Sequence, residues 1–167
     1  MGRLGASAGR ARTGALALAI CFTACLLGSA APILAQGEDA ASAARGALDE
    51  YIRAWNDEDN DAIAAITNFP RISIGLNGQI VVRDNPEEIV VDFDLLRAAE
   101  GWDHTTLDLV DATQVSPDKV HFRVVTSRRR ADGSPYRTTP ALYVVTNQDG
   151  QWGLQVQSVL PPTFSAR

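Results

Sequence analysis

The last third of the chain is divided into short strand-like runs by compact turn signals. Four runs rich in β-branched and aromatic residues lie between Asp103 and Leu160. They are separated by SPDK, ADGS and QDGQ, at residues 116–119, 131–134 and 148–151. Pro, Asp and Gly at such spacing are typical of tight turns between consecutive antiparallel strands. The pattern therefore predicts a four-stranded meander, which constrains the rest of the fold.

Each tight turn also predicts a pairing register, if its two central residues form the loop. Three independent counts place the same apolar set on one face, which we expect to point to the core: Leu107, Leu109, Val115, Val120, Phe122, Val124, Tyr143, Val145, Trp152, Leu154 and Val156. Polar residues share one end of this face: Asp111, Thr113, Thr126, Thr139 and Ser158, with Arg128 and Arg137 one row beyond.

Pro140 lies inside the third run, where a proline can mark a bulge. A one-residue slip would turn Gln155 and Gln157 inward in place of Leu154 and Val156. The apolar pattern therefore favours pairing without a net slip.

The opposite face of the predicted sheet carries one apolar row, made of Val110, Val125, Pro140 and Val159. A soluble monomer rarely leaves such a stripe in water. We therefore predict a homodimer through the outer sheet face, with an ordinary mixed surface as the alternative.

The stretch before the meander predicts three helices and a hairpin. Apolar residues recur at helical spacing from Ala40 to Trp55. A second helix is expected from Asp61 to about Asn68, because Pro70 prevents its continuation. Asn77-Gly78 then predicts a two-residue hairpin turn.

The third helix is expected from Asp84 to about Glu100. It begins with a capping residue, a proline and two acids, and Gly101 supplies its end. Its apolar positions are Ile89, Phe93 and Leu96. The whole predicts an α+β fold in the order α-α-β-β-α-β-β-β-β.

The first 35 residues differ in composition from the rest. Arg3, Arg10 and Arg12 precede an acid-free apolar run that covers residues 13–35. A basic stretch followed by an apolar run ending in small residues is typical of a secretory signal peptide. We predict a signal peptide at residues 1–35, cleavage after Ala35, and one exported domain at 36–167, in the periplasm or outside the cell.

Two alternatives concern the same segment. The run is just long enough to stay as an uncleaved N-terminal anchor, since about 20 apolar residues span a bilayer. Cys25 follows small residues, as the cysteine of a bacterial lipoprotein signal does. The abundant Ala, Gly, Ser and Thr of the apolar run favour cleavage over an uncleaved anchor. Phe22 argues against lipidation, because lipoprotein signals usually carry Leu at that position.

Charge and cysteine content exclude several functions for the mature domain. Both cysteines, Cys21 and Cys25, precede the predicted cleavage site, which argues against disulfides, thiolate metal sites and cysteine nucleophiles. Without the three early arginines, 12 basic residues face 20 acidic ones, a net charge of about −8 that opposes nucleic-acid binding. No metal-ligand spacing occurs, so we expect no metal, no other cofactor and no membrane association after cleavage.

The order helix, helix, hairpin, helix and meander resembles the nuclear-transport-factor-2-like superfamily, which includes SnoaL-like proteins, ketosteroid isomerases, scytalone dehydratases and limonene epoxide hydrolases. YIRAWNDEDNDAIAAI, at residues 51–66, is similar to the opening of the isomerases. KVHF at 119–122 and QWGLQVQS at 151–158 look like a branch of exported members. The resemblance implies a cone-shaped domain, with a strongly curved sheet wrapped round the helices and one apolar pocket.

The resemblance carries over only part of a catalytic site. Tyr51 matches the oxyanion-hole tyrosine of the isomerases, whereas the segment that holds their carboxylate base is RISIGLNG here, at residues 71–78, and has no acid. The epoxide hydrolases use an Asp-Arg-Asp set. The inward face predicted here offers Asp111 with Arg128 or Arg137, and no second Asp.

Three residues are candidates for chemistry. A carboxylate among apolar neighbours is costly unless paired or neutral, so Asp111 is expected to act as a pocket acid or base, or else to be satisfied by Thr126 and backbone donors. Tyr51 would stabilise developing charge or simply pack in the core. His104 would be an acid-base group at the pocket mouth or a structural hydrogen-bonding group.

The remaining pocket wall is expected from Trp55, Phe93, Trp102, Phe122, Thr126, Tyr143 and Ser158. Core packing alone would also account for the aromatic members. The Arg128–Arg130 run with Arg137 would attract an anion or lie solvated at a strand end.

Three functions remain open. The first is an exported domain that binds a small apolar or amphipathic molecule in its cone. The second is a cofactor-independent isomerase, dehydratase or hydrolase that uses Asp111 for proton transfer. The third is a protein-interaction module that uses the outer sheet face.

Overall fold

The computed structural model describes residues 31–161, with side chains from residue 37 onward. Its elements follow as α1 (Ala31–Asn56), α2 (Asn60–Ala65), β1 (Thr67–Ile74), β2 (Ile80–Arg83), the 3-10 turn η1 (Pro86–Ile89), α3 (Phe93–Glu100), β3 (His104–Ser116), β4 (Lys119–Arg129), β5 (Pro135–Gln148) and β6 (Gln151–Val159). The predicted α+β order is confirmed. Residues 1–30 of the predicted signal segment lie outside the described residues, and the predicted cleavage point after Ala35 falls inside α1.

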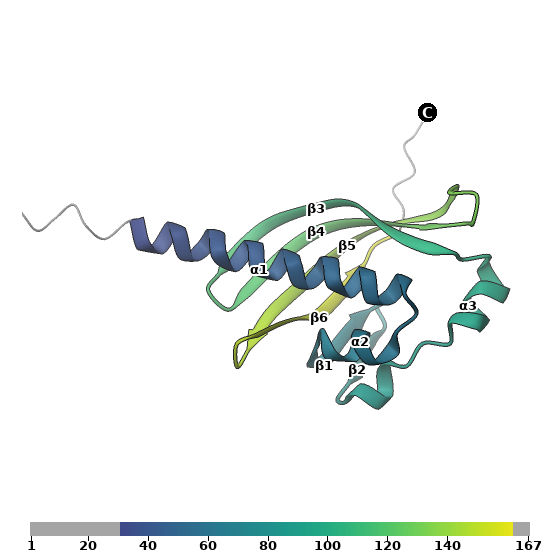
Figure 1. The fold of residues 1–167 in the computed structure, drawn as a ribbon, viewed down its shortest axis with the longest axis horizontal. Coiled ribbons are helices and arrows are strands. Elements are labelled where there is room, and N and C mark those ends of the chain that lie inside the picture. Colours follow the sequence, from purple (N-terminus) through teal and green to yellow (C-terminus); the bar gives the residue numbers. More distant parts are fainter. Residues whose placement is uncertain (1–30, 162–167) are drawn as a thin grey trace, which may run out of the picture.

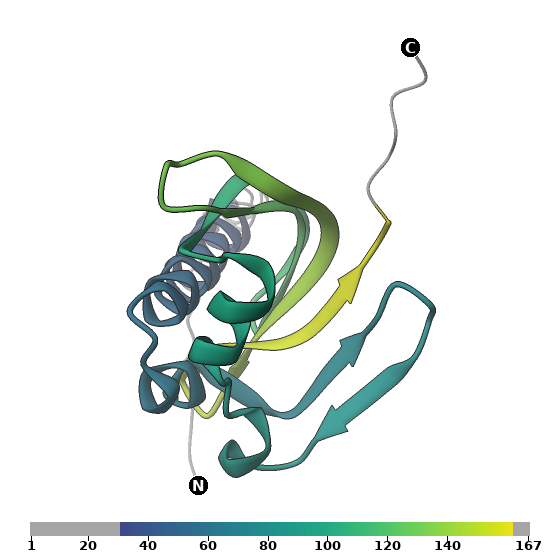
Figure 2. The same ribbon diagram turned by 90° about the vertical axis from the view of Figure 1, so that its right-hand side faces the viewer.

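The six strands form one sheet in the order β2-β1-β6-β5-β4-β3. All neighbours are antiparallel except β1 and β6, which run parallel. Figure 1 shows α1 lying along the strands of the meander, and Figure 2 shows the sheet bending round α1 and α3. This is the predicted cone, with helices on the concave face.

The core forms where α1 packs against the concave face. The buried face of α1 consists mostly of alanine, which lets the helix approach the sheet closely, and Ala44 and Leu48 are fully buried against the meander. The strands contribute Val120, Val124, Val145 and Leu154, all fully buried. Each such side chain stabilises the fold by about 1.5–3 kcal/mol through burial. A second cluster of Ala54, Ile63, Phe93 and Trp102 joins α1, α2 and α3.

The second helix is shorter than predicted, because it ends at Ala65 and β1 begins at Thr67. Contacts with other parts of the chain end the helix at this point. The Oγ1 atom of Thr67 donates to the carbonyl of Ile63 at 2.8 Å, and Nδ2 of Asn68 donates to the carbonyl of Thr146 at 2.8 Å. Pairing of Thr67 with Leu154 in β6 then continues the chain as a strand.

The predicted third helix is split into η1 and α3. The Asn60 side chain explains the break, since its Nδ2 donates to the carbonyl of Val91 at 3.1 Å and its Oδ1 accepts from the Val91 amide at 2.8 Å. Both backbone groups are therefore withdrawn from helical bonding. Asp92 starts α3 instead, because its carboxylate accepts from the Leu95 amide at 2.8 Å.

The hairpin β1–β2 is present, but its loop covers residues 75–79 rather than two residues, with Ile74 opposite Ile80. The Gly75 amide donates to the carbonyl of Gln79 at 2.9 Å, and Gly78 takes the left-handed conformation with φ 78°. Along β1, Ile72 and Ile74 pair with Val82 and Ile80 on the outer face.

The predicted register of β4 with β5 is confirmed from Phe122 opposite Tyr143 to Arg128 opposite Arg137. The pairing of β3 with β4 is different. Val115 lies opposite Val120 as predicted, but the register then shifts twice, at Thr113 and at Asp108. The resulting pairs are Ala112 with Phe122, Asp111 with Arg123, Val110 with Val124, Leu109 with Val125 and Leu107 with Thr126.

The prediction that Asp111 faces the core is therefore wrong. An extra residue in a strand turns all following side chains to the opposite face. Asp111 lies on the outer face, where Oδ2 accepts from Nη2 of Arg123 at 2.8 Å and the side chain is 48% exposed.

The prediction of no slip in β6 is also wrong. Val145 lies opposite Leu154, but Val144 lies opposite Val156, so the register shifts by one residue at Gln155. Gln157 consequently lies opposite Tyr143 on the inner face. Burial of a glutamine side chain costs free energy unless its polar atoms are hydrogen-bonded. That cost is offset here, because Gln157 hydrogen-bonds to both Arg71 and Tyr143.

These shifts also change the predicted apolar row of the outer face. Val110 and Val159 pack against the inner core cluster. The outer face keeps Val125 and Pro140, which pair with each other, and gains Leu109 opposite Val125. Leu142 continues this apolar surface and is 41% exposed.

Candidate functional site

The interior of the cone contains two adjoining chambers. The larger has a volume of about 610 Å³ and the smaller about 220 Å³. Tyr51, Trp55 and Gln157 line both of them, so these three side chains form the passage between the chambers. Pockets that bind small molecules usually have volumes of about 300–1,000 Å³. The combined volume of the two chambers falls within that range.

Two aromatic side chains of α1 line the helical side of the chambers, and aromatic packing continues from them into the core. Tyr51 and Trp55 are one helical turn apart on α1, and their ring centres are 6.4 Å apart. Phe93 of α3 lies edge-on to Trp55 at 5.3 Å and continues to Trp102 at 5.6 Å. The Nε1 atom of Trp55 is buried and, among the described residues, has no acceptor.

On the sheet side, β1 points Arg71 and Ser73 into the smaller chamber. Arg71 is only 4% exposed. Its Nη2 donates to Oε1 of Gln157 at 2.8 Å, and its Nη1 donates to the carbonyl of Ile72 at 3.1 Å. The Nε2 atom of Gln157 in turn donates to Oη of Tyr143 at 3.0 Å. A polar chain therefore runs from the smaller chamber into the larger one.

Tyr143 is a neutral phenol in this setting. Burial raises the pKa of Tyr143 well above its ordinary value, and the nearby Tyr51 raises it further. Because Oη accepts from Gln157, its proton is left to donate. The inner wall thus presents hydrogen-bond donors to whatever occupies the larger chamber.

The far end of the larger chamber carries two arginines from neighbouring strands. Arg128 and Arg137 are cross-strand partners, and Glu100 at the end of α3 lies between them. Oε2 of Glu100 accepts from Nη1 of Arg128 at 2.7 Å and from Oη of Tyr136 at 3.0 Å, and Nη1 of Arg137 lies 3.3 Å from Oε1. Partial burial opposes ionisation of Glu100, but Arg128, Tyr136 and Arg137 outweigh it and lower its pKa.

The predicted site residues fall into two groups. Tyr51, Trp55, Thr126 and Tyr143 line the larger chamber. Phe93, Trp102 and Phe122 are buried in the core clusters and are absent from both chamber walls. The register shift in β6 places Ser158 opposite Leu142, on the outer face. Gln157 and Val159 line the chamber in its place.

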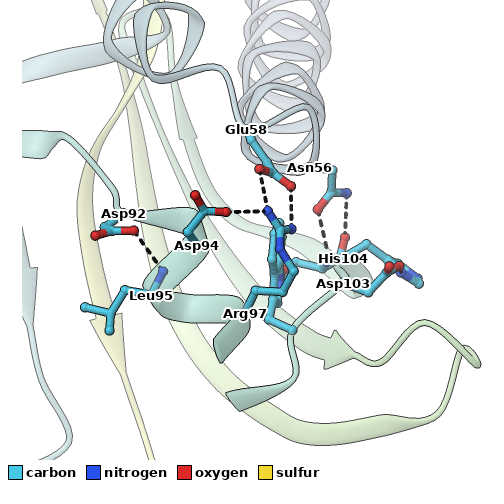
Figure 3. A network of polar contacts seen from close by, with 10 residues as sticks. Asn56, Glu58, Asp92, Asp94, Leu95, Arg97, Asp103 and His104 are labelled. Carbon is cyan, nitrogen blue, oxygen red and sulfur yellow. Dashed lines mark hydrogen bonds and ion pairs between the residues drawn. The ribbon is translucent and has the colours of Figure 1, made fainter. Parts of the chain in front are cut away.

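His104 lies at the start of β3, beside rather than in the chamber. Its Nδ1 is 2.8 Å from Oδ2 of Asp103. Figure 3 shows these two residues next to Asn56, whose side chain bonds both backbone groups of Thr105. Thr105 lines the larger chamber, whereas His104 does not. Neither Asp111 nor His104 therefore lines either chamber.

The network in Figure 3 also anchors the mouth of the cone. Nη1 of Arg97 donates to Oε1 of Glu58 at 2.7 Å, and its Nη2 donates to Oδ1 of Asp94 at 3.2 Å. The bond to Glu58 joins the turn after α1 to α3, and the bond to Asp94 holds the Arg97 side chain within α3. Hence α3 keeps Phe93 against Trp55 and Glu100 against the strands.

Sequence reasoning missed Arg71, Gln157 and Glu100. The alternation Arg-Ile-Ser-Ile in β1 does indicate that Arg71 and Ser73 share a face. The alternation does not show which of the two faces points inward. Apolar residues usually face the core, but here Ile72 and Ile74 lie on the outer face and Arg71 and Ser73 face the interior. Glu100 ends a helix that is far in sequence from Arg137, and no local sequence pattern indicates that it contacts Arg128 of β4 and Arg137 of β5.

The chain matches a known protein family over most of its length. Residues 41–161 match the family described as "NTF2-like protein (DUF6841)". That match spans most of the chain, so the protein belongs to this NTF2-like family. A search among curated proteins finds no similar sequence.

Solved structures show the same fold at low identity. A domain with a cystatin-like fold from Nostoc punctiforme is 20% identical, covers 76% of this chain and 80% of its own, and has a TM-score of 0.57. An NTF2-like protein from Streptomyces avermitilis, named provisionally as a dehydratase, is 13% identical over 76% and 98% with a TM-score of 0.58. An NTF-2 like protein from Shewanella oneidensis is 16% identical over 72% and 98%, with a TM-score of 0.50.

In the part of the chain that the structure describes, none of the helices combines the length and the apolar character that crossing a bilayer requires.

Proposed function

We propose that this protein binds one small amphipathic molecule inside its cone. The observation that carries the proposal is the larger chamber, with its aromatic wall on α1 and its hydroxyl donors on the sheet. NTF2-like proteins often bind small molecules or catalyse isomerase or dehydratase reactions. Among the described residues that line the larger chamber there is no Asp, Glu or His, which favours binding over proton transfer.

The same proposal includes export. Its support is the basic and then apolar composition of residues 1–35. Expression of the full chain in a bacterial host, followed by fractionation and N-terminal sequencing, tests it. A mature protein that begins at Gln36 is expected outside the cytoplasm, and an unprocessed cytoplasmic chain would contradict it.

Binding in the larger chamber is tested with a neutral solvatochromic dye such as Nile red. The dye is expected to bind with one site per chain, and Thr126→Trp is expected to reduce affinity at least about tenfold, because the indole fills the chamber. Fluorescence titration measures both. Gln114→Trp is the matched control, because Gln114 is exposed on β3 and lies outside both chamber walls.

If Thr126→Trp leaves dye binding unchanged, the dye binds elsewhere and the proposal loses its support. Native mass spectrometry of the purified protein gives an independent check. A small molecule that co-purifies with the wild type, and is lost from Thr126→Trp, is the expected result.

A homodimer through the outer sheet face is the second part of the proposal. Leu142 of β5 is 41% exposed and Ile80 of β2 is 63% exposed on the same face. Leu109, Val125 and Pro140 extend this surface across β3 and β4. A surface of this apolar character is typical of one that packs against a second copy.

Leu142→Arg is expected to convert the dimer to a monomer, because it places a second positive charge directly opposite Arg123 at the centre of the face. Analytical ultracentrifugation measures the mass in solution. Leu95→Arg serves as the control, since Leu95 is 63% exposed on α3, away from the sheet, and this variant should remain dimeric. A monomeric wild type at micromolar concentration would rule out the dimer.

A further inference from the structure

We propose that the ligand is a monocarboxylate whose carboxylate group binds Arg71 and Arg83 in the smaller chamber, while its apolar body occupies the larger chamber. This inference rests on the proposed binding function and specifies the chemical class of the ligand.

Arg71 is a buried charge without a counter-charge. It is 4% exposed, and no carboxylate of the described chain lies within ion-pair distance of its guanidinium group. The carbonyls of Gln157 and Ile72 accept two of its five N–H groups. A buried guanidinium normally requires a paired anion. An anion delivered by a ligand meets that requirement.

A second arginine increases the local positive charge. Arg83 is the cross-strand partner of Arg71 and lines the same chamber. Like charges directly opposite each other in a sheet are destabilising. The Nε atom of Arg83 donates to the backbone carbonyl of Glu88 at 3.0 Å, and none of the ion pairs in the described part of the chain involves Arg83.

The one carboxylate on the wall of this chamber, among the described residues, is that of Glu88. It is engaged elsewhere. Its Oε1 accepts from Nδ2 of Asn85 at 2.6 Å, and its Oε2 accepts from the Asp84 amide at 3.2 Å. Glu88 is exposed and makes no ion pair with Arg71 or Arg83 within the described structure.

The fold itself shows how a pair of this kind is neutralised. Arg128 and Arg137 are also cross-strand partners that face the interior, and Glu100 lies between them at 2.7 and 3.3 Å. Arg71 and Arg83 repeat the cross-strand arrangement, and among residues 37–161 no carboxylate pairs with them as Glu100 does with Arg128 and Arg137. A ligand carboxylate would occupy that place, since the planar guanidinium matches a carboxylate with two parallel hydrogen bonds.

The surroundings select an apolar molecule with a single small anionic group. Ile63, Ile89 and Val91 line the smaller chamber beside Arg71. The passage to the larger chamber is formed by Tyr51 and Trp55. When the carboxylate of the ligand binds Arg71, the apolar part of the ligand therefore lies next to the rings of Tyr51 and Trp55.

Isothermal titration at pH 7 with phenylbutyrate and its neutral isostere phenylbutyramide tests the proposal. The acid is expected to bind about 10–100-fold more tightly than the amide, as charge-assisted hydrogen bonds contribute. Arg71→Gln should abolish this preference. Arg123→Gln, which removes an exposed arginine of the outer face, should leave it unchanged.

A second variant keeps the test decisive if Arg71→Gln folds poorly. Gln157→Glu places a carboxylate of nearly the same shape next to Arg71, where Gln157 now accepts its hydrogen bond at 2.8 Å. We expect this variant to raise the thermal midpoint of the unliganded protein and to lose at least about tenfold in affinity for phenylbutyrate.

The outcomes separate the two proposals. Equal binding of acid and amide, or full retention of the preference in both variants, overturns the carboxylate proposal and leaves a pocket that binds neutral molecules. Displacement of phenylbutyrate by equimolar inorganic phosphate also overturns it, because the site would then recognise any anion. Absence of binding by phenylbutyrate, phenylbutyramide and Nile red alike overturns the binding function as well.

Discussion

Replacement of Gly153 by alanine is expected to lower the free energy of unfolding by about 2–3 kcal/mol, because the new methyl group has no space. A Cβ atom at Gly153 would lie 2.7 Å from Oδ1 of Asn68 and 3.0 Å from the Asn68 amide nitrogen. The Asn68 side chain cannot turn aside freely, since its Nδ2 donates to the carbonyl and to Oγ1 of Thr146 at 2.8 and 2.9 Å. The close approach lies where β1 first joins β6.

Urea denaturation followed by circular dichroism measures this effect. Gly46→Ala is the matched control, because nothing lies within 4 Å of a Cβ atom at Gly46 in α1. Alanine in a helix interior is favoured over glycine, so this variant should gain about 0.5–1 kcal/mol. A Gly153→Ala protein as stable as the wild type would mean that β1 and β6 do not approach each other in this way.

Glu100→Gln is expected to lower the free energy of unfolding by about 2–3 kcal/mol at pH 7, because Arg128 and Arg137 then face each other without an anion. The effect should depend on pH. The pKa of Glu100 is lower in the folded protein than its ordinary value of 4.5, so the unfolded state binds a proton first as the pH falls. Its stabilising contribution is complete above about pH 5.5 and is lost as the pH falls through the folded pKa.

The stability difference between wild type and Glu100→Gln should therefore shrink between pH 6 and pH 3. Urea denaturation at several pH values measures that difference. Asp111→Asn is the control, since it removes a carboxylate whose ion pair with Arg123 is exposed, and such pairs contribute about 0–1 kcal/mol. A difference for Glu100→Gln that stays constant over this range would show that Glu100 does not ionise between the two arginines.

Most of the fold follows from local signals in the sequence. The turns at 116–119, 131–134 and 148–151 predict the meander, and the register of β4 with β5 follows by counting from Asp132-Gly133. The helix ends were less predictable. Asn60 withdraws the backbone of Val91 from helical bonding, and a contact between residues so far apart in sequence leaves no local signal.

The candidate site was less predictable than the fold, because its residues depend on face assignment. Each shift in the register, at Asp108, Thr113 and Gln155, turns the following side chains over. Counting from the turns thus placed Asp111 inward and Gln157 outward, the reverse of the structure. Next to the turns at 116–119 and 148–151 the counts hold, as Val115 opposite Val120 and Val145 opposite Leu154 show. Next to the turn at 131–134 the pairing is irregular, with Arg129 opposite Pro135, and the count holds from Arg128 opposite Arg137 onward.

The shifts at Thr113 and Gln155 have a consequence for the evolution of related chains. Loss of Thr113 or Gln155 would remove the extra residue and keep the pairs beyond it, so Asp111 would stay opposite Arg123 and Gln157 opposite Tyr143. Entry of Thr113 or Gln155 into the regular ladder would instead turn over the strand beyond it, and would move Asp111 to the inner face and Gln157 to the outer face. A homologue could thus exchange interior and exterior side chains without a change in length, and alignments of this family should match residues in these strands by pairing partner rather than by residue similarity.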